Sequence, residues 1–162
     1  MAGGQTLLPT MKQRLAAPSD LVDISGVEEM RGICISGSEV TIGASTKHAE
    51  VASSAELRAV CPSLCDLASH IGDPAVRHMG TLGGSIANND PAADYPAAML
   101  ALNATIKTDK REIAADDYFT GMFSTALEEG EMIVSVSFEA PSKGAYDKFT
   151  KPAPNVVPSP AS

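Results

Sequence analysis

Two short stretches of the sequence combine glycines with small hydroxyl side chains, a pattern suited to holding phosphate groups. The first reads AGGQT at residues 2–6, and the second reads GTLGGS at residues 80–85. Glycine lets backbone N–H groups approach a ligand closely, and clustered N–H groups form an anion-binding site. Two such loops could hold the two phosphates of one dinucleotide from opposite sides. On residue types alone, they are also typical of two tight turns.

Other chemistry has little support in the sequence. It contains no GxGxxG pattern after a predicted strand and no GxxxxGK[ST] pattern. His48, His70 and His78 have no spacing to a carboxylate or a cysteine that suggests a catalytic pair. We expect these histidines at the surface or in packing, and we nominate no catalytic residue and no metal ligand.

The composition is that of an ordinary soluble protein of about one domain. The chain has 162 residues, of which 44% are hydrophobic, and its net charge is −8. This acidic balance argues against binding to nucleic acid or to anionic membranes. The cysteines, expected as buried or half-buried thiols, are too few to hold an iron–sulfur cluster: Cys34, Cys61 and Cys65. Without a signal-peptide pattern or a membrane span, we expect a cytoplasmic protein.

Local patterns predict the first elements that must position the two loops. Residues 32–45 alternate in polarity around Gly37–Ser38, which predicts a β-hairpin. Ser53 and Glu56 have the spacing of a capping box, so we expect a short helix that begins near Ser54.

The later part of the chain alternates between short helices and strands. A helix is expected to begin at Pro62 and to end at Gly72, and another is expected after Asp94. Further strands are expected at residues 105–108 and 132–138. Residues 151–162 hold four prolines and are expected to form an unstructured tail. The expected core spans about residues 20–140 and is α+β, with a mainly antiparallel sheet.

Four longer stretches, in chain order, extend the pattern: AGGQTLLPTMKQRLAAPSDLVDI, TIGASTKHAEVASS, RHMGTLGGSIANNDPAADYPAAMLALNATI and EMIVSV. Together they resemble the FAD-binding medium subunit of the xanthine dehydrogenase and carbon monoxide dehydrogenase family of molybdenum hydroxylases. The resemblance implies an α+β fold of the FAD-binding PCMH, or vanillyl-alcohol-oxidase, type. This chain would contain mostly the second subdomain of that fold. The resemblance implies a partial PCMH-type domain at residues 1–140. Residues 141–162 would then be the start of a truncated C-terminal region and a proline-rich tail.

The resemblance also implies a chain shortened at both ends, to about half of a usual subunit. Family members carry a segment before the AGGQ loop, whereas here Met1 directly precedes Ala2. We therefore expect the first loop to fray and FAD to bind weakly or not at all to the isolated chain.

Within the family, the two glycine loops bind the FAD pyrophosphate. The resemblance implies that backbone N–H groups of both loops bind phosphate oxygens, together with the hydroxyls of Thr6, Thr81 and Ser85. Valine at Gly83 or Gly84 is expected to abolish flavin binding while leaving the fold mostly intact.

Outside the two glycine loops, the family resemblance rests on single residues. Asn88 and Asp94 match positions that contact the sugar and ribityl hydroxyls, and Asp94 is equally well placed as a helix N-cap. Ile71 and Ile133 fall near positions that pack on the cofactor rings, although ordinary core packing explains them as well. Lys148 or Lys151 falls near a family lysine close to the cofactor. The expected cofactor-binding residues are therefore Ala2, Gly3, Gly4, Gln5, Thr6, Ile71, Thr81, Leu82, Gly83, Gly84, Ser85, Asn88, Asp94, Ile133 and Lys148.

The family chemistry implies an oxidoreductase subunit that is active within a larger complex. A large subunit carries the molybdenum cofactor, and a small subunit carries the [2Fe–2S] clusters that reduce the FAD. The FAD then passes electrons to NAD, a quinone or another acceptor, and the protein places and tunes the flavin. Two alternatives stay open: a fragment that folds and binds the partner subunits without flavin, and a module for another adenine-containing ligand.

Overall fold

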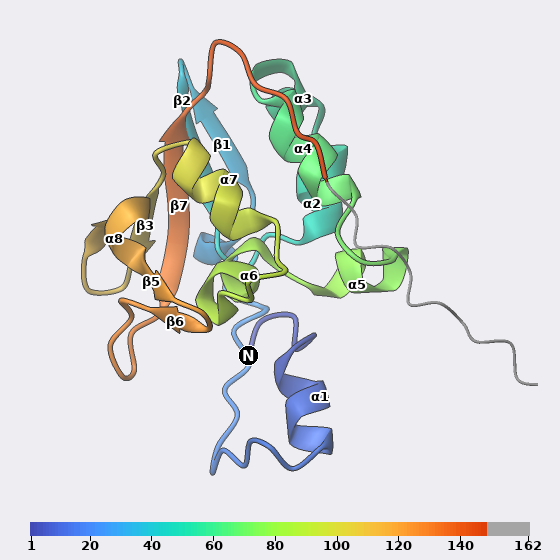
Figure 1. Ribbon diagram of the computed structural model, residues 1–162, viewed down its shortest axis with the longest axis vertical. Coiled ribbons are helices and arrows are strands. Elements are labelled where there is room, and N and C mark those ends of the chain that lie inside the picture. The colour runs from blue at the N-terminus through green and yellow to red at the C-terminus, as the bar shows by residue number, and fades with distance from the viewer. Residues whose placement is uncertain (149–162) are drawn as a thin grey trace, which may run out of the picture.

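A five-stranded sheet is the framework of the computed structural model, which describes residues 1–148 (Figure 1). The strands lie in the order β1, β2, β7, β3 and β4, and every neighbouring pair is antiparallel. Their bounds are Ile33–Ser36 for β1, Glu39–Gly43 for β2, Thr105–Thr108 for β3, Glu112–Ala114 for β4 and Ile133–Glu139 for β7. A separate pair consists of β5 (Phe119–Gly121) and β6 (Ser124–Thr125). The predicted tail, with Lys151, lies outside the described residues.

Short helices connect the strands. They are α1 (Leu7–Lys12), α2 (His48–Ser53), α3 (Ala55–Val60), α4 (Pro62–Ser69), α5 (Pro74–Met79), α6 (Leu82–Asn88), α7 (Tyr95–Ala101) and α8 (Ala115–Tyr118), with a 3-10 turn at Glu28–Met30. Helices α2, α3 and α4 group together, and α1 lies beyond α6 at the far end of the molecule (Figure 1). None of the helices in residues 1–148 is long and apolar enough to cross a membrane. The α+β class and the mainly antiparallel sheet are thus confirmed.

A row of β-branched residues crosses the whole sheet at one register. Val136 of the central strand β7 pairs with Ile42 of β2 on one side and with Ile106 of β3 on the other, and all three side chains are fully buried. Ile33 and Ile113 extend the row to the two edge strands. Because each fully buried side chain of this size contributes about 1.5–3 kcal/mol, this row fixes the strand register.

The predicted hairpin and the helix predicted near Ser54 are both present, but the N-cap of that helix lies one residue later than predicted. The hairpin at residues 32–45 is present, and Gly37 takes the positive φ of +63° that its turn requires. The helix predicted near Ser54 begins at Ala55, but its cap is Ser54, whose hydroxyl accepts the Leu57 N–H. Ser53 instead ends α2, a helix that the sequence patterns did not predict.

The helix that begins at Pro62 is present, but it ends three residues before Gly72. Its last residue is Ser69, and Gly72 takes a φ of +51° in the turn that follows. The helix after Asp94 and the strand at residues 105–108 lie where the sequence predicts them, and the strand predicted at residues 132–138 lies one residue later, at 133–139.

Glu131 ties the turn between β3 and β4 to the segment before β7. Its carboxylate binds Arg111 through two contacts of 3.0 Å and accepts the Thr108 hydroxyl at 2.8 Å. The Glu128 N–H donates to the same carboxylate, whose side chain is fully shielded from solvent. These donors, with Arg111 the strongest, lower the pKa of Glu131 to about 2.

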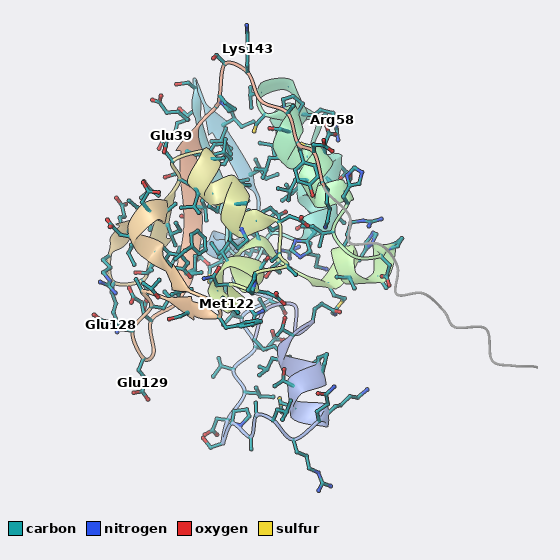
Figure 2. All side chains as sticks on the ribbon, viewed as in Figure 1. Glu39, Arg58, Met122, Glu128, Glu129 and Lys143 are labelled. Carbon is teal, nitrogen blue, oxygen red and sulfur yellow. The ribbon has the colours of Figure 1, made fainter. Side chains whose placement is uncertain are left out.

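The Glu131 contacts make a contribution to stability that depends on pH. A carboxylate with a lowered folded-state pKa stabilises the fold above its ordinary pKa of 4.5, and this contribution disappears as the pH falls toward about 2. We therefore expect Glu131→Gln to lower the urea midpoint at pH 7 and to differ much less from the parent near pH 3. Glu129→Gln is the matched control, because Glu129 is exposed at the end of the loop before β7 (Figure 2). Equal midpoint losses at both pH values would contradict this account.

Candidate functional site

The two predicted loops meet at one cleft of about 730 Å³. The predicted residues that line the cleft are Ala2, Gly3, Gly4, Gln5, Thr6, Thr81, Gly84, Ser85 and Asn88. Other lining residues come from α1, α2, α5 and the turn after α6. The cleft therefore joins segments that are about eighty residues apart in the chain, as the dinucleotide interpretation requires.

The first loop is fixed in place, but its backbone donors are free. The Met1 carbonyl accepts the Ile24 N–H at 3.0 Å, and the Gly4 carbonyl accepts the Leu8 N–H at 3.0 Å. Gly3 packs against the backbone after α5, where a Cβ atom would lie 2.0 Å from the Met79 carbonyl oxygen. Within residues 1–148, no backbone N–H of residues 2–6 donates a hydrogen bond. Five consecutive donors at the cleft thus lack a protein acceptor.

The second loop is mostly a helix, and this changes which of its donors can reach a ligand. Thr81 is the N-cap of α6, which begins at Leu82. The first three N–H groups of the helix already bond within the protein: Leu82 to Thr46 O (3.0 Å), Gly83 to Ala44 O (2.8 Å) and Gly84 to Thr81 Oγ1 (3.1 Å). The expectation that these N–H groups bind phosphate does not fit this geometry. On the α6 side of the cleft, the groups that can still donate a hydrogen bond to a ligand include the hydroxyls of Thr81 and Ser85.

The two central glycines differ in role. Gly84 is exposed at the cleft, whereas Gly83 is buried against Ala44, where a Cβ atom would lie 2.6 Å from the Ala44 Cβ. Neither takes a positive φ, because both lie within α6. Valine at Gly83 would therefore disturb the fold itself, in contrast to the expectation from sequence.

Asp94 does not act as a helix cap. It stands at the N-cap position of α7, but its side chain makes no capping hydrogen bond. Its carboxylate accepts the Tyr146 hydroxyl at 3.0 Å and the Lys148 ammonium at 2.8 Å. Asp94 lines a second pocket, of about 370 Å³, between α4, α7 and residues 141–147. The structure thus brings Asp94 and Lys148 together, next to Ala93 at the edge of the cleft.

The remaining predicted residues lie around the cleft or apart from it. Ile133 is buried and lines an apolar pocket of about 190 Å³ that shares Ala2 and Gly84 with the cleft. Leu82 is fully buried in the core, and Ile71 is half-buried against it without lining the cleft.

Two residues that the sequence did not nominate belong to the cleft region. His48 lines the cleft and is 5% exposed, and its ring lies 5.3 Å from that of Tyr95. Burial lowers the pKa of His48 to about 4, so the ring is neutral near pH 7. The second residue is Asn89, at the C-terminal end of α6.

Asn89 fixes the end of α6 to the β5–β6 hairpin. It is 8% exposed and takes a positive φ of +45°. Its side-chain amide nitrogen donates to the carbonyls of Gly121 and Ser124 at 2.8 and 2.9 Å, and its backbone carbonyl accepts the Phe123 N–H. The helix that carries three of the predicted cleft residues, Gly84, Ser85 and Asn88, is therefore fastened at both ends. No sequence signal separates Asn89 from Asn88, because the partners of Asn89 lie more than thirty residues away.

The antiparallel sheet, its short helices and the cleft between a glycine loop and the start of α6 define an α+β domain of the FAD-binding type. Residues 1–141 match the family described as FAD binding domain in molybdopterin dehydrogenase. The chain belongs to this family.

Relatives with known names agree with this assignment. The carbon monoxide dehydrogenase medium chain of Hydrogenophaga pseudoflava is 40% identical, with 93% of this chain and 55% of the relative covered. The glyceraldehyde dehydrogenase medium chain of Sulfolobus acidocaldarius is 37% identical, with 93% and 54% covered. This chain thus spans about half the length of the curated relatives it matches.

Solved structures agree as well. A carbon monoxide dehydrogenase structure from Hydrogenophaga pseudoflava superposes with a TM-score of 0.88 at 41% identity, covering 93% of this chain and 55% of that chain. Quinoline 2-oxidoreductase from Pseudomonas putida gives a TM-score of 0.84 at 36% identity, covering 88% and 51%.

Proposed function

We propose that this chain is the FAD-binding part of the medium subunit of a molybdenum hydroxylase, with the FAD pyrophosphate in the cleft. The observation that carries the proposal is the set of five backbone N–H groups at residues 2–6 that donate no hydrogen bond within residues 1–148, in a loop that lines the same cleft as Thr81 and Ser85. Donors without acceptors are what a phosphate group satisfies. Family membership supports FAD as the phosphate-bearing ligand.

The residues present fit such a cofactor. The first loop would bind the pyrophosphate through its backbone, while Asn88 offers an amide to a sugar hydroxyl. Ile133 contributes apolar surface to the adjoining pocket. Bound FAD supplies reversible acceptance of electrons, and the protein binds it, orients it and excludes water from it. The PCMH-type domain would then cover residues 1–140, and the Asp94 and Lys148 pair would lie at its edge.

The partners follow from the same proposal. A small subunit with [2Fe–2S] clusters would deliver electrons from a large molybdenum-cofactor subunit, and NAD or a quinone would accept them. The chain would thus act as an oxidoreductase subunit within a complex. The names of several relatives, as medium chains of dehydrogenases, support this assembly.

A flavin titration of the purified chain tests the cofactor. The sequence predicts a frayed first loop and weak or no FAD binding, but the Ile24 and Leu8 hydrogen bonds hold this loop in place. Addition of FAD is therefore expected to quench the FAD fluorescence with saturation at one FAD per chain, and to give a protein-bound flavin absorbance. An inability to retain FAD at any concentration would favour the alternative of a fragment that folds without flavin.

Gly4→Ala is expected to weaken FAD binding at least about tenfold. Gly4 has a φ of +68°, and an added Cβ would lie 2.9 Å from a Leu8 methyl carbon, so alanine shifts the loop that carries the free donors. Gly130→Ala is the matched control, because Gly130 has a similar φ of +71° with open space around it. Unchanged FAD affinity in Gly4→Ala would show that the first loop does not hold the pyrophosphate.

A further inference from the structure

Among the described residues, the cleft has no lysine or arginine side chain to balance a diphosphate. Among the described residues that line it, no lysine or arginine is present, and His48 is the single side chain that can carry a positive charge. Asp90 also lines the cleft, but its carboxylate accepts the Ala92 N–H at 2.8 Å. Apart from the Met1 ammonium, which donates to the Val22 carbonyl, a ligand with phosphoryl oxygens in this cleft therefore depends on hydrogen-bond donors and on His48.

The two ring nitrogens of His48 are in different situations. Nδ1 is enclosed and has no hydrogen-bond partner within the described residues. Nε2 likewise has no hydrogen-bond partner within the described residues, but unlike Nδ1 it is not fully enclosed by protein. It lies beside Gly80, where a Cβ atom would come within 2.6 Å of it. The absence of a side chain at Gly80 thus leaves Nε2 uncovered at this point, and both His48 and Gly80 line the cleft.

The ring itself is held in a fixed place. His48 is the first residue of α2, and its backbone N–H donates to the Gly80 carbonyl at 3.0 Å. The ring lies against the fully buried Tyr95. A rigid ring of a cleft-lining residue, with a nitrogen that has no partner within the described residues, is a preorganised ligand-binding group.

We infer that His48 is a binding residue of the cleft, and that its Nε2–H donates a hydrogen bond to a phosphoryl oxygen of the bound dinucleotide. This inference rests on the proposed function and adds a residue to it. A neutral imidazole donor suits the site, because burial disfavours the charged ring until an anion is present to pair with it. The ligand class is a diphosphate, either within FAD or alone.

Nitrogen NMR on protein with isotope-labelled histidine tests the inference. FAD and inorganic pyrophosphate are titrated separately, and the Nε2 signal of His48 is expected to shift in step with saturation. The signals of His70 and His78, which lie outside the cleft lining, are expected to stay in place. Signals are assigned with His70→Gln and His78→Gln variants.

Affinity measurements on variants give a second, independent readout. His48→Leu removes the donor and is expected to weaken FAD binding at least about tenfold. His48→Gln places an amide donor near the Nε2 position and is expected to stay within about threefold of the parent. His78→Leu is the control for replacing an exposed histidine, and far-UV circular dichroism verifies that each variant is folded.

The outcomes separate this inference from the proposed function. Saturation by FAD with an unmoved His48 signal would overturn the inference and leave the FAD site standing. A His48 shift with pyrophosphate in a protein that does not bind FAD would support the inference and contradict the flavin assignment. If the His48 signal shifts with neither ligand, the inference is overturned, even where His48→Leu fails to fold.

Discussion

Replacement of Gly83 by alanine is expected to lower the free energy of unfolding by about 2–4 kcal/mol, and valine is expected to prevent native folding. An added Cβ would lie 2.6 Å from the Ala44 Cβ and 2.7 Å from its carbonyl oxygen, so α6 must move away from the end of β2. This movement also breaks the 2.8 Å bond from the Gly83 N–H to the same carbonyl. Since domains of this size are stable by only about 5–15 kcal/mol, the loss is severe.

Urea unfolding followed by circular dichroism measures this effect. Gly26→Ala is the matched control, because an added Cβ at Gly26 meets no atom within 4 Å and its φ is not positive. It is expected to change stability by less than about 0.5 kcal/mol. A Gly83→Ala variant as stable as Gly26→Ala would show that α6 does not depend on this close contact.

Asn89→Asp is expected to destabilise the fold by at least about 3 kcal/mol at pH 7. The substitution replaces an amide that donates to two carbonyls with a carboxylate that can only accept, and it places a negative charge against both oxygens. Asn89→Ala removes the two bonds without adding charge and is expected to cost about 2 kcal/mol.

Thermal unfolding with a matched control tests this prediction. Asn103 follows α7 with a φ of +46°, close to that of Asn89, but it is exposed and its side chain makes no hydrogen bond within the described residues. Asn103→Asp is therefore expected to leave the melting temperature nearly unchanged. Equal shifts at the two positions would mean that backbone conformation, and not the hairpin contact, gives Asn89 its importance.

Local sequence predicted the elements whose causes are local. The β1–β2 hairpin depends on alternation around one turn, and the start of α4 depends on a proline that is already restricted to helical φ. Both were predicted correctly. The N-cap of α3 was misplaced by one residue because Ser53 and Ser54 are adjacent and both suit an N-cap, and Ser54 forms no capping box.

The second glycine stretch was predicted as a loop because adjacent glycines disfavour a helix. The helix α6 forms there since Gly83 can pack against Ala44 and Thr81 can cap the first turn. The contact between Gly83 and Ala44 joins segments about forty residues apart, so no local pattern contains it, whereas the Thr81 cap is local. His48 and Asn89 were missed because their contacts are tertiary, whereas the two glycine stretches, together with the resemblance to the family, located both halves of the cleft.

The position of β7 in the sheet also determines when the domain can form during synthesis on the ribosome. β7 lies at the centre, between β2 and β3, yet it is the last strand of the described residues. Until residues 133–139 emerge, the β1–β2 and β3–β4 hairpins have no strand to join them, and each exposes an unpaired edge. The nascent chain must therefore remain open over most of its length, and it is most exposed to wrong strand pairing just before translation of β7 is complete.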